Sequence, residues 1–211
     1  MGKFDYKKED KNLYLPKTEP MIIDVPKMLF MMIDGKGDPN TSEDYKIALE
    51  SLYGLTYTIK MKGKHIKDYF EYVVPPLEGL WDTDLENIVD NRIKDKSKFK
   101  WTMMVRQPEF VTIEVFNWAK EELHKKKPDL DLSKVRLETY EEGKCAQIMH
   151  IGSYDDEYIS KEKLESLIFE TGYEYDINEK RKHHEIYISD PRKVAAEKLK
   201  TVIRYPIKKQ T

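Results

Sequence analysis

The sequence is poor in several features that define whole classes of protein. It has one cysteine, Cys145, in 211 residues, so the chain can form no internal disulfide and no zinc site built from several cysteines. It has no apolar run of the roughly 18 residues that a membrane-spanning helix needs, and residues 1–20 lack the apolar stretch of a secretory signal. We therefore expect a cytoplasmic protein with no membrane partner, in which Cys145 serves packing.

An excess of charge of one sign is also missing. The 37 basic and 39 acidic residues leave a formal net charge of -2. Such balance gives no electrostatic footprint for nucleic acid, and no basic helix-turn-helix segment is recognisable in the chain. We expect no direct nucleic-acid binding. The chain is instead rich in side chains that suit both a core and an adaptable ligand surface, with 14 Tyr, 7 Phe, 3 Trp and 9 Met.

Hydrophobic periodicity predicts an order of elements that occurs twice. The first unit consists of a strand, a helix and two strands, over 28–37, 41–63, 69–76 and 99–108. The second unit repeats this order over 144–152, 155–172, 183–191 and 199–206. The last strands, TMMVRQP and TVIRYP, share a threonine, an apolar centre, an arginine and a terminal proline. We therefore predict a duplicated strand-helix-strand-strand unit.

These elements predict an α+β fold. Each half alone has too little apolar area to be stable, so the two small sheets should join into one pseudo-two-fold antiparallel sheet. We expect helices on one face of this sheet and a ligand groove on the other. One domain should span 21–207, after a loosely held N-terminal arm over 1–20. Its parts are repeat one (about 28–108), a connecting helix and strand (109–142) and repeat two (about 144–206), with a further short helix expected over 82–95.

The strand KHHEIYISDP (182–191) carries the most informative candidate residue. Alternation places its isoleucines on the helix-covered face and sends His183, Glu185 and Tyr187 toward the groove. A carboxylate between aromatic walls can act as a general acid or base if burial raises its pKa, or attract a cationic ligand when ionised. An edge-strand glutamate in water is an equally good interpretation. No third ligand at a recognised spacing accompanies His183 and Glu185, so we expect neither a metal nor another cofactor.

A second candidate segment is VPPLEGLW (74–81), in which two prolines fix the backbone and Gly79 allows a tight turn. It should deliver Glu78 and Trp81 from a rigid loop, and a rigidly held aromatic ring can stack on a planar ligand at little entropic cost. Alternation alone does not decide which face of residues 70–74 or of 99–105 lines the groove.

Five segments together resemble the standalone GyrI-like small-molecule-binding family over about residues 20–207: MLFMMIDGKGDPN, YFEYVVPPLEGLW, WTMMVRQPEF, CAQIMHIGSYDDE and KHHEIYISDPRKVAAEKLKTVIRYP. The resemblance implies the duplicated architecture, shared with effector domains of multidrug-responsive regulators, and an aromatic groove with a central acidic residue, which would be Glu185. It implies that some standalone members hydrolyse cyclopropane-bearing DNA-alkylating compounds. One departure is Asp82, where relatives often have a second aromatic after the tryptophan.

Two functions therefore stand side by side. In the first, Glu185 is catalytic and the chain detoxifies cyclopropane-bearing alkylating toxins by hydrolysis. In the second, the groove only sequesters or senses hydrophobic or cationic small molecules. Either way, we expect a monomer or a homodimer whose ligand contacts come from Tyr72, Glu78, Trp81, Trp101, Tyr140, Tyr154 and Tyr187.

Overall fold

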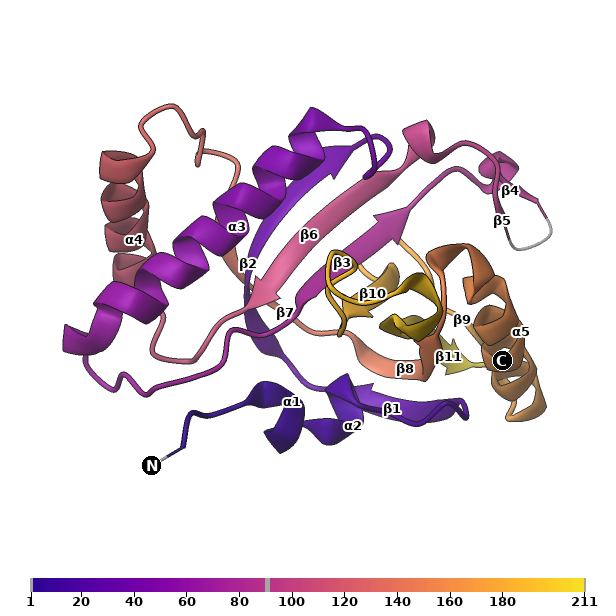
Figure 1. The fold of residues 1–211 in the computed structure, drawn as a ribbon. Coiled ribbons are helices and arrows are strands. Elements are labelled where there is room, and N and C mark those ends of the chain that lie inside the picture. Colours follow the sequence, from indigo (N-terminus) through magenta and orange to yellow (C-terminus); the bar gives the residue numbers. More distant parts are fainter. Residues whose placement is uncertain (1, 90–91, 211) are drawn as a thin grey trace.

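The computed structural model describes residues 2–89 and 92–210. Within these ranges the chain forms one nine-stranded antiparallel sheet and a separate two-stranded ribbon. Figure 1 shows the large sheet as a curled layer. Its path runs through β1 (Met21–Val25), β8 (Gly143–Ile151), β11 (Lys200–Lys209), β10 (His183–Tyr187), β3 (Leu77–Asp82), β6 (Lys100–Arg106), β2 (Met28–Lys36) and β7 (Arg136–Tyr140), and β9 (Tyr173–Tyr175) pairs with β11.

The α+β class predicted from the sequence is confirmed. Strands β10 and β3 pair at the middle of the sheet. Strands of the second predicted unit lie on one side of this pair and strands of the first unit on the other. The duplication itself and its pseudo-two-fold axis stay predictions.

Two helices, α3 (Glu43–Lys62) and α5 (Glu157–Glu170), pack on one face of the sheet. Ser42 caps α3, because its hydroxyl accepts a hydrogen bond from the backbone N–H of Tyr45, and acidic residues in the first turn suit the positive end of the helix. The apolar stripe of α3 covers β2 and β6, while α4 (Ile113–Lys126) packs against α3. Helix α5 buries Leu164 and Ile168 in a second, smaller core.

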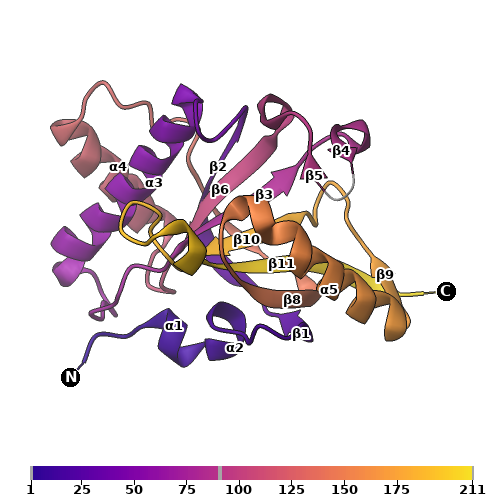
Figure 2. The ribbon, with the colours of Figure 1, turned by 45° about the vertical axis from the view of Figure 1, so that its right-hand side comes forward.

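The N-terminal segment covers the opposite face of the sheet. It contains the short helices α1 (Tyr6–Glu9) and α2 (Lys11–Tyr14), which Figures 1 and 2 show on the side of the sheet away from α3. Tyr6, Leu13 and Tyr14 are buried. The expectation of a loosely held arm is therefore wrong, because three large side chains of this segment belong to the main core.

A cluster of charged groups lies buried beneath the N-terminal segment. The His184 ring is 3.0 Å from a Glu78 oxygen and 2.9 Å from a Glu142 oxygen. Arg204 donates a hydrogen bond of 2.6 Å to Glu142 and another, of 2.9 Å, to the carbonyl of Leu13. Opposite charges and backbone acceptors thus compensate for the loss of water.

Two predicted elements differ from those observed. The strand expected over 69–76 is reduced to an isolated bridge between Phe4 and Tyr72, and strand β3 begins at Leu77, after Pro75 and Pro76. Proline lacks the N–H that a central strand needs, so the prolines precede the strand. In place of a helix over 82–95, the chain has a 3-10 turn and the β4 (Ile88–Val89) and β5 (Arg92–Ile93) ribbon, while residues 90–91 of this prediction lie outside the described residues.

The remaining short elements are 3-10 turns: η1 (Gly63–His65), η2 (Leu85–Asn87), η3 (Lys96–Lys98), η4 (Tyr154–Asp156) and η5 (Ala196–Lys198). Cys145 is buried on β8, and burial raises the pKa of its thiol to about 12. None of the helices in the described ranges has the length and hydrophobicity to cross a bilayer. The cytoplasmic location stays a prediction.

Candidate functional site

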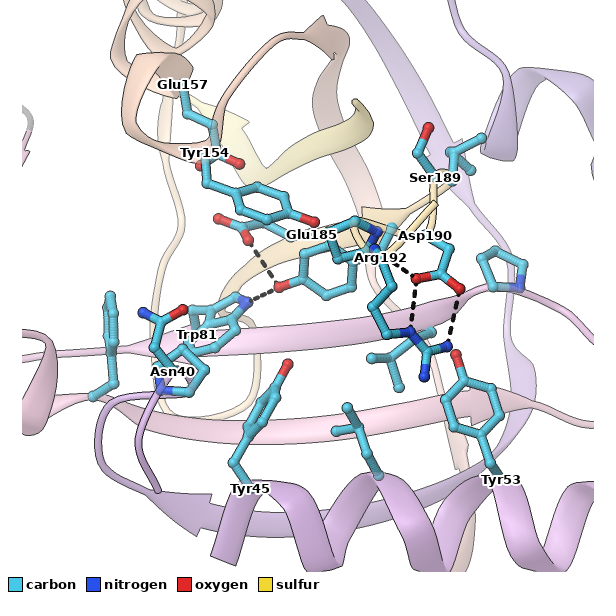
Figure 3. Close-up of a pocket in the computed structure, with 18 of the residues that line it drawn as sticks. Asn40, Tyr45, Tyr53, Trp81, Tyr154, Glu157, Glu185, Ser189, Asp190 and Arg192 are labelled. Atoms are coloured by element: carbon cyan, nitrogen blue, oxygen red, sulfur yellow. Dashed lines mark hydrogen bonds and ion pairs between the residues drawn. The ribbon is translucent and has the colours of Figure 1, made fainter. Parts of the chain in front are cut away.

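A cavity of about 1410 Å³ opens on the face of the sheet that carries α3 and α5. Figure 3 shows Tyr45 and Tyr53 pointing into it from α3, with Trp81, Glu185 and Tyr154 opposite them. Ligand pockets in proteins commonly measure about 300–1,000 Å³, so this cavity has room for a ligand of several rings.

The groove predicted on the face opposite the helices is therefore on the helix-bearing face. Glu185 and Trp81 line the cavity, and the ring of Tyr45 from α3 lies over Trp81, with centroids 6.4 Å apart. Ile186, expected to face the helices, points to the other face, where it pairs in register with Glu78. The prediction of opposite faces is wrong because α3 and α5 leave the middle of their face open, whereas the N-terminal segment closes the other.

The α3 wall of the cavity includes Tyr45, Leu49, Tyr53 and Tyr57. A four-residue spacing places these side chains on one face of the helix. The ring of Tyr45 also meets the core edge-on at Trp101, with centroids 5.2 Å apart. The core thus holds this end of the wall in place.

Glu185 lies on the cavity floor with both carboxylate oxygens engaged. His183 Nε2 is 2.8 Å from Oε1, and the hydroxyl of Tyr187 donates a 2.9 Å hydrogen bond to Oε2. Trp81 Nε1 in turn donates a 2.8 Å hydrogen bond to the Tyr187 hydroxyl. Burial alone would raise the pKa of Glu185, but the hydrogen bonds from His183 and Tyr187 and the nearby ammonium of Lys161 hold it low. The geometry therefore favours an ionised carboxylate.

A second carboxyl group, that of Glu157, lies beside Glu185 at the start of α5. Its side chain is 6% exposed, and Lys161 Nζ is 3.1 Å from its Oε2. Its Oε1 has no hydrogen-bond partner among the described residues. Burial and the neighbouring Glu185 carboxylate raise the pKa of Glu157. The pKa values of these two neighbouring carboxyl groups are therefore shifted in opposite directions.

His183 lies close to both carboxyl groups. One ligand atom each from Glu157, His183 and Glu185 lie within 4.8 Å of one another, a spacing that a cation could bridge. The ammonium of Lys161 already supplies positive charge there, and the rings of His183 and Tyr205 stack with centroids 4.4 Å apart. Burial lowers the pKa of His183. The expectation that the site holds no metal stays a prediction.

Five residues singled out in the sequence line the cavity, namely Trp81, Tyr154, His183, Glu185 and Tyr187. The ring of Tyr154, from η4, meets the ring of Tyr187 edge-on, with centroids 6.0 Å apart. Asp82, the departure from the family pattern, forms a salt bridge with Lys182. It therefore completes no aromatic wall.

The other four predicted ligand contacts lie elsewhere. Tyr72 is 0% exposed and packs among aromatic rings that include Phe110. Glu78 belongs to the buried charged cluster, because it alternates with the cavity-lining Leu77 along β3. Two residues are held by other parts of the sheet, Trp101 through its Nε1 hydrogen bond to the carbonyl of Gly37 and Tyr140 through its place on the outer strand β7.

Sequence reasoning missed Tyr45 and Tyr53 as cavity residues, and also Glu157 and Lys161. The repeat of tyrosine along α3 was the available signal, but an aromatic stripe on a helix is usually part of the core. Glu157 follows two aspartates at a helix start, which is typical of a solvated first turn. Only its position beside Glu185 sets it apart.

Comparisons with known proteins agree with this architecture. An uncharacterised conserved protein from Listeria innocua is 46% identical, with a TM-score of 0.91, over 98% of this chain and 100% of its own. A structure described as a hydrolase from Listeria innocua is 44% identical, with a TM-score of 0.88 and the same two coverages. A comparison with the curated proteins gave no match.

The EcmrR C-terminal domain shares the fold alone, at 12% identity and a TM-score of 0.54, over 91% of this chain and 98% of that domain. The GyrI-like small molecule binding domain matches residues 18–208, which includes every strand of the large sheet except the last residue of β11, and every cavity residue from Pro39 onward. The family inferred from the sequence motifs is confirmed. The chain belongs to the GyrI-like small-molecule-binding family.

Proposed function

We propose that this chain binds flat, hydrophobic or cationic small molecules in the cavity and hydrolyses those that carry a strained cyclopropane. The observation that carries the proposal is the Glu185 carboxylate, held by His183 and Tyr187 on the floor of an aromatic cavity. The 44% identity to a Listeria innocua protein described as a hydrolase supports a reaction over binding alone.

Three aromatic side chains near Glu185 would hold the ligand. Trp81, Tyr45 and Tyr154 offer ring faces and edges on different sides of the cavity. Rings stack on planar ligands and have few rotatable bonds to immobilise, so ordering them costs little entropy. Enclosure also excludes bulk water from the reacting carbon, which strengthens the electrostatic effect of the carboxylate.

Glu185 acts as the general base for ring opening. The oxygen of a water molecule forms a bond to a cyclopropane carbon while the ring carbon–carbon bond breaks. The electron pair of the broken bond moves into the conjugated carbonyl of the ligand, and Glu185 accepts the proton that the water loses. Relief of ring strain supplies part of the driving force.

The test is the substitution Glu185→Gln, which keeps the shape of the side chain but removes the base. We expect affinity for a cyclopropane-containing pyrroloindole, followed by tryptophan fluorescence, to stay within a few-fold, while mass spectrometry detects no ring-opened product. The matched control is Glu197→Gln, an exposed glutamate outside the cavity lining. Equal rates of product formation in Glu185→Gln and wild type would exclude the catalytic role.

The same assay decides between catalysis and sequestration. If the wild-type protein binds the compound but forms no product, the chain is a binding protein that sequesters such molecules. Product in the wild type and in Glu197→Gln, but not in Glu185→Gln, supports the hydrolase.

A further inference from the structure

We propose that Glu157 and Glu185 form a single acid–base pair, in which Glu157 carries the one shared proton at rest and Glu185 carries the charge. During turnover, Glu157 donates that proton to the ligand oxygen while Glu185 accepts a proton from water. The turnover part of this inference rests on the proposed hydrolysis. The resting proton on Glu157 does not, and it can be measured without a substrate.

The first argument is the burial of two carboxyl groups together. Both Glu157 and Glu185 are largely shielded from solvent, with side chains 6% and 13% exposed. Two neighbouring carboxylates in such surroundings repel each other strongly, so one of them keeps its proton. Near neutral pH, the state of lowest free energy for this cluster is therefore the one in which the two carboxyl groups share one proton.

The second argument is an asymmetry in hydrogen bonding that decides where the proton lies. Glu185 is contacted at both oxygens, by His183 and by the hydroxyl of Tyr187. Glu157 is contacted by Lys161 at Oε2, whereas Oε1 lacks a partner among the described residues. An anion on Glu157 would leave the buried Oε1 without a donor, whereas Glu185 has a donor at each oxygen, so the charge belongs on Glu185.

The other groups around the pair agree with this assignment. The titratable side chains that face it are Lys161 from α5, Tyr45 from α3, Tyr154 from η4, His183 and Tyr187 from β10, and Tyr205 from β11. Burial raises the pKa of each of these tyrosines and lowers that of His183, so all of them are neutral at pH 7. The positive charge of Lys161 and the negative charge of Glu185 then cancel, which leaves the cluster with no net charge.

The pair makes the proposed reaction balance without an outside acid. Water adds its oxygen to the cyclopropane carbon, and its proton passes to Glu185. The electron pair released from the ring reaches the ligand carbonyl oxygen, which takes the proton of Glu157. The proton on Glu185 then moves to Glu157, which restores the resting state, so the net change is the addition of water to the ligand.

Infrared difference spectroscopy tests the resting proton. Wild type minus Glu157→Gln should show one protonated carboxylic acid at pH 7 that disappears in the variant, whereas wild type minus Glu197→Gln should show none. Glutamine resembles a protonated glutamate in shape and polarity, so the melting temperature of Glu157→Gln should match that of the wild type. A carboxylic acid signal that is absent in the wild type, or that persists in Glu157→Gln, would overturn the assignment.

Turnover tests the second part. We expect Glu157→Gln to lower kcat by about 100-fold or more, the usual effect of losing a general acid, with KM within a few-fold of the wild type. Unchanged kcat in this variant, or stoichiometric metal bound to purified protein in place of the shared proton, would overturn the role of Glu157. If neither the wild type nor any variant forms product, the proposed hydrolysis is wrong, but the infrared result still shows which glutamate carries the proton.

Discussion

Gly35 is the position where the smallest change in the chain should have a large effect. It lies directly opposite Trp101 in the β2–β6 ladder, and the indole folds over it. A Cβ built at Gly35 would lie 2.0 Å from Cη2 of Trp101 and 2.4 Å from its Cζ2. Because these contacts are far inside van der Waals distance, Gly35→Ala requires the indole or the strand to move.

The indole has little freedom to move. The ring of Tyr45 meets the indole of Trp101 edge-on, with centroids 5.2 Å apart, and the indole Nε1 donates a 3.2 Å hydrogen bond to the carbonyl of Gly37. Overpacking costs about 1–3 kcal/mol, and loss of that hydrogen bond adds about 1 kcal/mol. Alanine recovers about 0.5–1 kcal/mol because it reduces the freedom of the unfolded chain. We therefore expect Gly35→Ala to lower the free energy of unfolding by roughly 1–3 kcal/mol.

Urea unfolding followed by circular dichroism measures this change. The control is Gly2→Ala, since a Cβ at Gly2 meets nothing within 4 Å. The double variant Gly35→Ala/Trp101→Phe should be more stable than the sum of the two single changes predicts, because the smaller ring relieves the clash. Stability of Gly35→Ala within about 0.5 kcal/mol of the wild type, or additive effects in the double variant, would refute the argument from steric overlap.

Two further predictions concern the buried charged cluster. Burial alone would lower the pKa of His184, but Glu142 and Glu78 raise it to about 9. Protonated His184 therefore stabilises the folded state fully below the unfolded pKa of about 6.5, and this contribution, up to about 3 kcal/mol, is lost as the pH rises through 9. The urea midpoint should fall over that pH range. An unchanged midpoint would contradict this prediction. Tyr14→Phe should cost about 1–3 kcal/mol in the same assay, because it removes the 3.2 Å hydrogen bond to Glu78; a cost equal to that of the half-exposed control Tyr57→Phe would argue against it.

Alternation along β10 was enough to predict the floor of the site. Two-residue periodicity requires Glu185 and Tyr187 to share a face and Ile186 to take the other, as observed. It does not say what covers each face. The cover of the reverse face comes from α1 and α2, each of four residues, which are too short to produce a helical hydrophobic pattern.

The rest of the site depends on contacts between distant parts of the chain. Glu157 acquires its properties from Glu185, 28 positions later in the sequence, and the reverse face joins Glu78, His184 and Arg204 in one cluster. No local pattern distinguishes a glutamate that will meet another carboxylate from one that will meet water. Trp101 shows the same limit, since its partner, Gly35, is fixed by strand register and not by spacing along the chain.

The N-terminal segment limits how far the chain can be shortened from its N-terminus. The family match begins at residue 18, but the backbone carbonyls that accept hydrogen bonds from Gln147 and Arg204 belong to Asn12 and Leu13. A chain shortened to the matched region would lose the segment that covers the buried charged cluster. The side chains of Glu78, Glu142, His184 and Arg204 would then be partly exposed to water. The hydrophobic core therefore extends beyond the region that the family model matches, at least as far as Tyr6.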